Sequence, residues 1–265
     1  MSVQSNNVRS TIQLTEVVEQ AINDIRSITT AIVTDVANGL VTLTGDFSSF
    51  VFSCNPANNL DKYLLVTFGG NTQEFQKCKL TESGTVTIPR NRSFPLVVND
   101  EVEVLEQSPF YFEGTQTSIG LLNQAQPAIV LLNPASKNTT FSNSAMALTD
   151  RYSVQIMFTD FSEDYRRGNG SFVGTVKGYN NDYYVQYIQK PLAVYVSRLL
   201  KKLNHYIYTN GAIKVTVTLE DESFKEQFME FMGTQHSPAF NAITANVSGW
   251  VVNLNLTLHN AACIV

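Results

Sequence analysis

Apolar positions at helical spacing come first along the chain. Thr15, a good N-cap, precedes apolar side chains that recur every three or four residues. We therefore expect a short helix from Thr15 to about Arg26, behind a polar arm. The pattern then changes to β-branched runs at Ile28–Val36 and Leu40–Thr44, which Asn38-Gly39 separates. Because Asn-Gly readily adopts the positive φ angles of a two-residue turn, it predicts a β-hairpin here.

Further short strands are expected before residue 106, with turn residues such as Gly69-Gly70-Asn71 and Ser83-Gly84 between them. Closely spaced strands with sharp turns favour a small antiparallel barrel or sandwich. An OB-like barrel is one option, and the spacing leaves the topology open. The expected strands are Phe50–Ser53, Tyr63–Phe68, Glu74–Leu80, Thr85–Ile88 and Glu101–Leu105.

A second module is expected from Pro109 to the end of the sequence. The apolar run Pro127–Leu132 has the length of a buried strand, and Arg151–Asp160 alternates between apolar and polar residues. Alternation is clearest near the end, where Val252, Leu254, Leu256 and Leu258 are predicted to face inward and Asn253, Asn255 and Thr257 outward.

Helices and loops separate these strands. An amphipathic helix is predicted over Asp182–Asn204, which Pro191 would kink or restart. Phe224–Met232 is also predicted to be helical, and Leu121-Leu122 to lie on a short helix. Two polar stretches, Asn133–Asn143 and Glu163–Asn181, are predicted to be long loops.

These patterns predict an α+β protein with two modules. An N-terminal arm and short helix occupy residues 1–27, and a small antiparallel β-barrel or sandwich occupies residues 28–106. Residues 109–265 form an α+β module in which one long helix covers an antiparallel sheet.

Composition adds an expectation about the surface. Apolar residues make up 43% of the chain, but charged residues only 15%, against about 25% in typical proteins. Asn, Thr, Ser and Gln take their place. Surfaces that pack against other subunits carry little charge because desolvating charge is unfavourable, so this composition favours an oligomer. A weakly charged β protein without partners is the alternative.

Charge and hydropathy limit the partners. The net charge is −5, and the basic pairs are Arg166-Arg167 and Lys201-Lys202. We therefore expect no tight DNA binding, although DNA could slide past a weakly repulsive wall. No apolar run approaches the roughly 18 residues of a membrane span, so no membrane partner is expected. The polar N-terminus does not resemble a signal peptide, which predicts a cytoplasmic protein.

Cysteines and histidines do not gather in the sequence as metal ligands or catalytic groups do. The spacings match no zinc motif and no nucleophile–base–acid order, so we expect neither a metal nor a cofactor. A dyad of His259 and Cys263 is the conceivable exception. An odd number of cysteines leaves at least one thiol unpaired, which fits a reducing compartment. The residues are Cys54, Cys78, Cys263, His205, His236 and His259.

An acidic cluster at Asp160, Glu163 and Asp164 precedes the arginine pair. It could form a carboxylate pair or a divalent-ion site, but we favour a solvated loop or an ion pair between acidic and basic residues of neighbouring copies. Long loops in compact domains are usually functional or disordered, so we place candidate interface residues on the two loops. They are Asn133, Ser136, Lys137, Asn138, Asp160, Glu163, Asp164, Arg166, Arg167 and Asn169.

Four segments of the second module follow one another in a recognisable order. This order resembles the tail-completion and neck proteins of tailed bacteriophages, the connector or tail ring proteins, particularly those of crAss-like Bacteroides phages. The resemblance covers the chain from about Pro109 onward and leaves the first module outside it. The segments are PAIVLLNP (Pro127–Pro134), DRYSVQIMFTDFSEDY (Asp150–Tyr165), YNNDYYVQYIQKPLAVYVSRLL (Tyr179–Leu200) and ANVSGWVVNLNLTLHNAAC (Ala245–Cys263).

The resemblance implies a tail-terminator-like fold, a sheet with packed helices, in a non-enzymatic structural protein of the virion. It implies homo-oligomeric hexameric or dodecameric rings, assembled in the host cytoplasm, that continue the DNA channel. The implied partners are the portal, adaptor or tail proteins of the same particle. Two other functions stay open. One is a glycan- or receptor-binding baseplate or fibre-adaptor module, and the other is a hydrolase that uses Asp160, Glu163 or His259.

Overall fold

The computed structural model describes residues 6–51, 64–75, 79–80, 84–107, 109–114, 127–132, 137–142, 147–161, 184–210, 213–219, 225–229 and 247–260. The chain folds into two compact units. The inserted unit spans Arg26–Phe110, and the α+β unit combines Met1–Ile25 with Tyr111–Val265. The N-terminal helix, which the sequence suggested as part of a separate arm, therefore belongs to the α+β unit.

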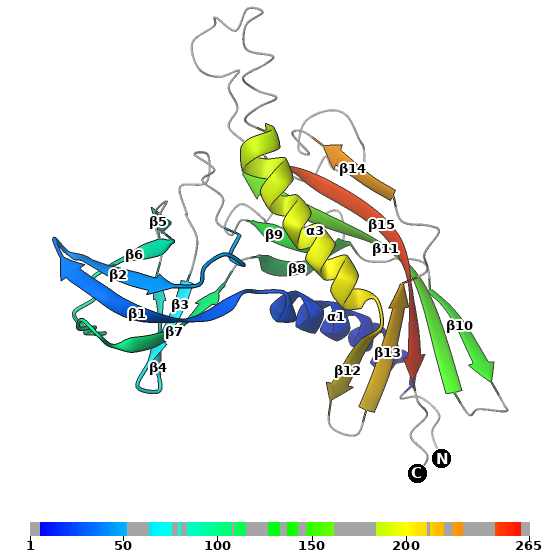
Figure 1. Ribbon diagram of the computed structural model, residues 1–265. Helices are drawn as coiled ribbons and strands as arrows, with labels where there is room; N and C mark the ends of the chain where they lie inside the picture. The colour runs from blue at the N-terminus through cyan, green and yellow to red at the C-terminus, as the bar shows by residue number, and fades with distance from the viewer. Residues whose placement is uncertain are drawn as a thin grey trace, which may run out of the picture. The chain divides into compact units, whose positions relative to one another are not determined.

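The inserted unit is built on one curled antiparallel sheet (Figure 1). Its strands lie in the order β4-β3-β7-β1-β2-β6-β5. The strands are β1 (Ile28–Ala37), β2 (Leu40–Gly45), β3 (Leu64–Phe68), β4 (Asn71–Phe75), β5 (Lys79–Leu80), β6 (Thr85–Pro89) and β7 (Glu101–Glu106).

The predicted hairpin between β1 and β2 is confirmed. Asn38 and Gly39 have φ angles of 52° and 76°, as a type I′ turn requires, and Ala37 pairs with Leu40 across it. The prediction of a strand beginning at Phe50 is wrong at its start, because Phe50 and Val51 lie outside any strand, and residues 52–53 lie outside the described residues.

Alternate residues of these strands form one apolar core. In β1, for example, Ala31 and Val33 are buried, and in β7 Val102 and Val104 are buried. The two ends of the inserted unit are joined beside this core. The backbone N–H of Glu106 donates to the carbonyl of Ser27 at 2.8 Å.

The α+β unit contains eight described strands in one antiparallel sheet. Two long strands pair along their whole length at its centre, β11 and β15. Strands β10 and β9 continue the sheet beside β11, and strands β13 and β14 continue it beside β15. The strands are β8 (Phe110–Gly114), β9 (Ala128–Leu132), β10 (Lys137–Ser142), β11 (Ala147–Phe161), β12 (Tyr206–Asn210), β13 (Ile213–Leu219), β14 (Lys225–Met229) and β15 (Val247–Asn260).

Helices cover one face of this sheet, as Figure 1 shows for α3. The π-helix η2 (Tyr184–Gln189) runs into α3 (Lys190–Leu203), and α3 packs on β11, β13 and β15. Pro191 lacks the N–H that an α-helix would donate to the carbonyl four residues earlier, so the wider π-turn before it is understandable. The long covering helix predicted around Pro191 is thereby confirmed. Helix α1 (Asn6–Asp24) starts earlier than predicted and packs on α3 and β12.

Two local predictions in the α+β unit are wrong. Lys137–Ser142, expected within a loop, is strand β10 and forms an antiparallel pair with β11. Lys225–Met229, expected within a helix, is strand β14 and pairs with residues 249–253 of β15. In both places a long neighbouring strand offers its hydrogen-bonding edge, and this tertiary contact outweighs local propensity. The expected loop Glu163–Asn181 and helix at Leu121-Leu122 lie outside the described residues.

Candidate functional site: three interaction surfaces

Strands β11 and β15 present two chemically different faces. Most of their even-numbered residues, among them Tyr152, Val154, Leu254 and Leu256, are buried on the side of the helices. The paired registers of β10, β11, β15, β13 and β12 place the other residues together on the opposite side, where Met157, Thr159 and Val251 at one end are buried and the remaining positions are mainly polar. We call this side the polar sheet face. Its described members are Asn138, Thr140, Thr149, Arg151, Ser153, Gln155, Ile207, Thr209, Thr216, Thr218, Asn253, Asn255, Thr257 and His259.

Hydrogen bonds between side chains cross the strands of the polar sheet face. Ser153 Oγ donates to Asn255 Oδ1 at 2.6 Å, and Gln155 Nε2 donates to Asn253 Oδ1 at 2.8 Å. The ring of His259 lies 3.4 Å from the hydroxyls of both Thr149 and Thr218. These contacts hold short polar side chains in an ordered array, so little side-chain entropy remains to be lost when another surface packs on it.

The polar sheet face is weakly charged. None of the side chains described on this face is a carboxylate, and Arg151 is the one permanent cation among them; by register, Lys214 opposite Thr209 and Lys225 opposite Asn253 also fall on this side. Most of these residues are exposed or half-buried. A neutral array of hydroxyls and amides can exchange hydrogen bonds with water for bonds with a protein without burying an unpaired charge. This is the chemistry of a protein-docking surface.

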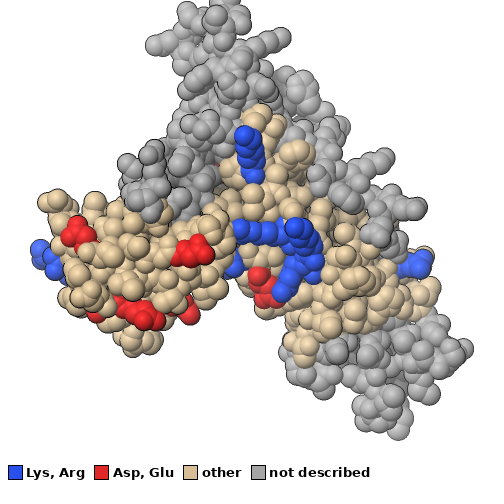
Figure 2. All heavy atoms as spheres, in the orientation of Figure 1, with Lys and Arg blue, Asp and Glu red and all other residues tan. Residues whose placement is uncertain are grey.

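The exposed side of α3 forms a second surface, the α3 basic face. It consists of Lys190, Val194, Ser197 and Lys201, which recur at helical spacing; Val194 is 39% exposed. No described carboxylate pairs with Lys190 or Lys201. Figure 2 shows basic side chains gathered over this helix.

Two other cations of α3 are held within the α+β unit. Lys202 Nζ lies 2.9 Å from Asp24 Oδ2 of α1, and Arg198 donates to the carbonyl of Ile25 at 3.4 Å. Partial burial raises the pKa of Asp24, but hydrogen bonds from Lys202, Gln20 and Tyr206 outweigh it and leave this pKa below its usual value. Lys202 and Arg198 therefore fasten α1 to α3.

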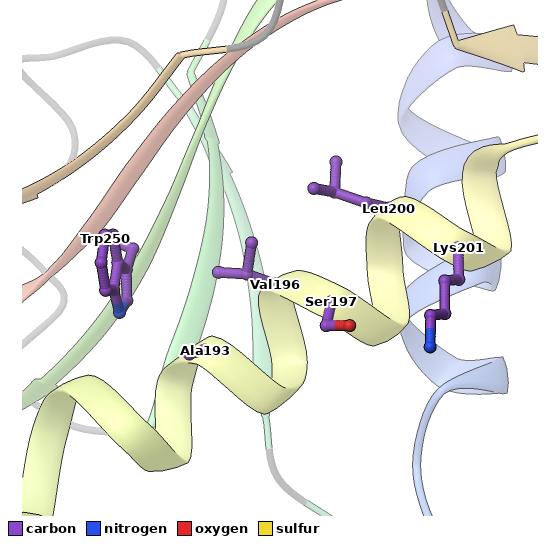
Figure 3. A pocket seen from close by; sticks show the side chains of 6 residues that line it. All are labelled: Ala193, Val196, Ser197, Leu200, Lys201 and Trp250. Carbon is purple, nitrogen blue, oxygen red and sulfur yellow. The ribbon is translucent and has the colours of Figure 1, made fainter. Parts of the chain in front are cut away.

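A shallow hollow of about 280 Å³ adjoins the α3 basic face. Val196 and Leu200 line it from the helix, and Trp250 lines it from β15. Figure 3 shows the indole facing the helix across the hollow, which Lys201 also lines. Trp250 Nε1 donates to the carbonyl of Gln189 at 3.1 Å, which ties the junction of η2 and α3 to the sheet. The hollow therefore combines apolar side chains with the polar side chains of Ser197 and Lys201.

The solvent side of the sheet in the inserted unit is the third surface, the acidic face. Its two exposed isoleucines, Ile28 and Ile32, are 57% and 48% exposed. Glu101 lies directly opposite Ile32 on β7, and Glu103 opposite Thr30. Strands β1, β2, β3, β4, β6 and β7 contain no Lys or Arg, and Lys79 of the edge strand β5 falls on this side by register. The acidic face consists of Ile28, Ile32, Asp35, Glu74, Glu101 and Glu103.

The described interface candidates lie on strands rather than loops. Lys137 Nζ lies 3.2 Å from Asp150 Oδ2, and Asn138 is exposed on the polar sheet face. Asp160 lies within β11 opposite Ser248 and is only 1% exposed, so neither a solvated loop nor an exposed interface residue describes it. The remaining candidates lie outside the described residues. They are Asn133, Ser136, Glu163, Asp164, Arg166, Arg167 and Asn169.

His259 is the histidine that could form a dyad with Cys263 or act in a hydrolase. Its described neighbours are threonine hydroxyls, and Cys263 and His236 lie outside the described residues. Within the described part of the chain, no three His, Cys, Asp or Glu side chains are grouped as a metal ion would require. No described helix combines the length and the apolar character needed to cross a membrane.

Sequence reasoning missed the α3 basic face and the acidic face. The alternation Glu-Val-Glu-Val at 101–104 was a usable signal, since it places both carboxylates on the solvent side of one strand. The spacing of Lys190, Val194 and Lys201 was a similar signal for one side of a helix. What the sequence alone did not supply was the neighbouring strand that adds Ile28 and Ile32.

No protein-family model, no curated protein and no solved structure matches this chain.

Proposed function

We propose that this chain is a non-enzymatic structural protein that assembles with copies of itself into a ring in the neck or tail of a tailed phage. The observation that carries the proposal is the polar sheet face. A broad exposed array of hydroxyls and amides, ordered by bonds such as Ser153–Asn255, is suited to packing against protein. The ordered series of motifs in the second module supplies the phage context.

The balance of charge supports the channel role. The chain carries a net charge of −5, so a ring of several copies would present a mildly repulsive wall to DNA. DNA could then pass through without being held. In this role the ring continues the channel from the portal and docks the next tail component, within a virion assembled in the host cytoplasm.

We propose a finer fold for each unit on the same basis. The curled sheet of the inserted unit, with its single core, is consistent with a small barrel of the OB type. The α+β unit, with α3 across one face of an antiparallel sheet, is consistent with a tail-terminator-like module. In this proposal the α+β unit builds the ring and the inserted unit decorates it.

The test is the mass and shape of the purified full chain. Sedimentation velocity over a range of concentrations should show a species of several chains, and negative-stain images should show rings with a central opening. A chain that keeps the mass of one copy at every concentration, and that does not occur in purified particles, would rule the proposal out. Binding of surface polysaccharide by such a single copy would support the glycan-binding alternative instead.

A matched pair of variants tests the polar sheet face itself. Ser153→Glu places a carboxylate at its centre, and Ser93→Glu places one at an exposed position of the inserted unit outside it. Burying an unpaired carboxylate is strongly unfavourable, so we expect Ser153→Glu to weaken assembly by about tenfold or more and Ser93→Glu to leave it unchanged. Equal assembly by both variants would show that this face is not an interface.

A further inference from the structure

We infer that the α3 basic face of one copy docks on the acidic face of a second copy. The inference rests on the proposed function in one respect, which is that the partner is another copy of this chain. It adds the two surfaces that meet and the groups that join them, and it gives the inserted unit a direct part in the contact between copies in addition to its decorating role.

The charges of the two surfaces are complementary. Lys190 and Lys201 have no described carboxylate as a partner, and no described cation pairs with Glu101 or Glu103. Each surface therefore keeps charge of one sign available. Opposite charges across an interface guide encounter and set its orientation, and like charges would repel wrong arrangements.

Both surfaces also carry exposed apolar side chains beside the charges. On the acidic face these are Ile28 and Ile32, and on α3 it is Val194, next to the hollow lined by Trp250. An exposed aliphatic side chain without a cover is unfavourable in water. Docking would place one of the two isoleucines over Val194 and the other one at the hollow. A charged rim around an apolar centre is the usual arrangement of a specific interface.

The spacing of the charges fits as well. Lys190 and Lys201 are eleven residues apart on one helix, about 16 Å at the rise of an α-helix. On the acidic face, Glu74 pairs with Leu65 and Leu65 pairs with Leu105, four residues beyond Glu101. Glu74 therefore lies four residues along the strand direction and two strand spacings across from Glu101. In a flat sheet this is a distance of about 17 Å. Both lysines can therefore meet a carboxylate at once.

The two surfaces are different parts of the chain, which has a consequence for symmetry. Contact between unlike surfaces is heterologous, and each copy keeps one free surface of each kind after binding a neighbour. Such contacts continue until a ring closes or a filament grows. The polar sheet face is then a second contact between copies, in addition to this one.

A charge exchange in the full-length chain tests this interface. One variant, Glu101→Lys with Glu103→Lys, makes the acidic face basic. The other, Lys190→Glu with Lys201→Glu, makes the α3 basic face acidic. The control, Arg90→Glu with Arg92→Glu, reverses two exposed charges of the inserted unit outside both faces. Circular dichroism and thermal melting establish that each variant is folded.

Each of the two variants should self-associate about a hundredfold more weakly than the wild type, because each then faces its own copies with like charges. Mixing them should restore assembly in alternating order, since each reversed surface again meets an opposite charge. The control should assemble like the wild type. Restoration on mixing cannot come from misfolding, so it separates a lost contact from a lost structure.

Four results would overturn the inference or the function on which it rests. Undiminished assembly of either variant, or no recovery when folded variants are mixed, would overturn the interface while leaving the ring proposal standing. Equal loss in the control would also overturn it, since general charge would then govern assembly. A wild-type chain that stays single at all concentrations would overturn the proposed function itself.

Discussion

Tyr208 donates a hydrogen bond from its phenol to Glu16 Oε2 at 2.9 Å, joining residues 192 positions apart. Tyr206, two residues earlier on β12, does the same to Asp24 Oδ2 at 3.1 Å. Both carboxylates belong to α1. The first helix is thereby fixed to a strand formed late in the chain, which is why the α+β unit is not continuous in sequence.

The bond between Tyr208 and Glu16 should contribute measurably to stability. Tyr208→Phe keeps the ring but removes the donor, so the free energy of unfolding should fall by about 1 kcal/mol. Glu16→Met, which removes the acceptor, should produce a similar loss. Urea denaturation of both single variants and the double variant measures their coupling, and purely additive losses would show that the two groups do not interact.

Gly249 of β15 should tolerate no side chain. A Cβ atom at this position would collide with the backbone carbonyl of Phe158 on β11. Gly249→Ala should therefore lower the free energy of unfolding by about 3 kcal/mol or more. Gly70→Ala is the matched control, since Gly70 has a φ of +79° but open space around it. The free energy of unfolding of Gly70→Ala should fall by about 1 kcal/mol, from backbone strain alone. Similar melting temperatures for the two variants would contradict this.

The buried carboxylate of Asp150 depends on β10. Asp150 accepts a hydrogen bond from Thr139 Oγ1 at 2.6 Å and lies 3.2 Å from Lys137 Nζ. Lys137→Met would leave a buried charge without its cation, and we expect a loss of about 2 to 3 kcal/mol in thermal or urea unfolding. Adding Asp150→Asn should recover part of that loss. A stable Lys137→Met variant would show that the ion pair is dispensable.

Alkaline conditions should destabilise the α+β unit. Burial, and then the charge of Asp24, raises the pKa of Tyr206 above its usual value, and burial together with Glu113 does the same to the pKa of Tyr111. In the unfolded chain a tyrosine phenol ionises at about pH 10. The folded protein keeps these phenols protonated to a higher pH than the unfolded chain does. The free energy of unfolding is therefore undiminished below about pH 10 and falls as the pH rises above it. Urea unfolding across this range measures the slope, which should be shallower in Tyr206→Phe; an unchanged slope would exclude Tyr206 as a source.

Elements with a strong local signal were predictable from sequence. Asn38-Gly39 specifies its hairpin because the positive φ angles of the turn are a property of those residues. The alternation that ends at Leu258 specifies a strand with one buried face because side chains alternate across a strand. Thr257, predicted to face outward and lie exposed, is an exception, since it is buried. The amphipathic spacing around Pro191 specifies a covering helix for a similar reason.

Elements that depend on a distant partner were not predictable. Strands β10 and β14 form because β11 and β15 are long enough to pair with them, and nothing within KNTTFS or KEQFM announces this. Asp160 looked like part of a solvated acidic cluster, yet β11 extends through it and buries it.

The sequence by itself determined that the chain is α+β, poor in charge, and built of short strands followed by a sheet with a long helix. These properties follow from local periodicity and composition. Only the tertiary structure decided that α1 completes the later unit, and which polar residues share one open face. It also placed Ile32 beside Glu101, because the pairing of strands brings together residues whose separation along the chain carries no local energetic signal.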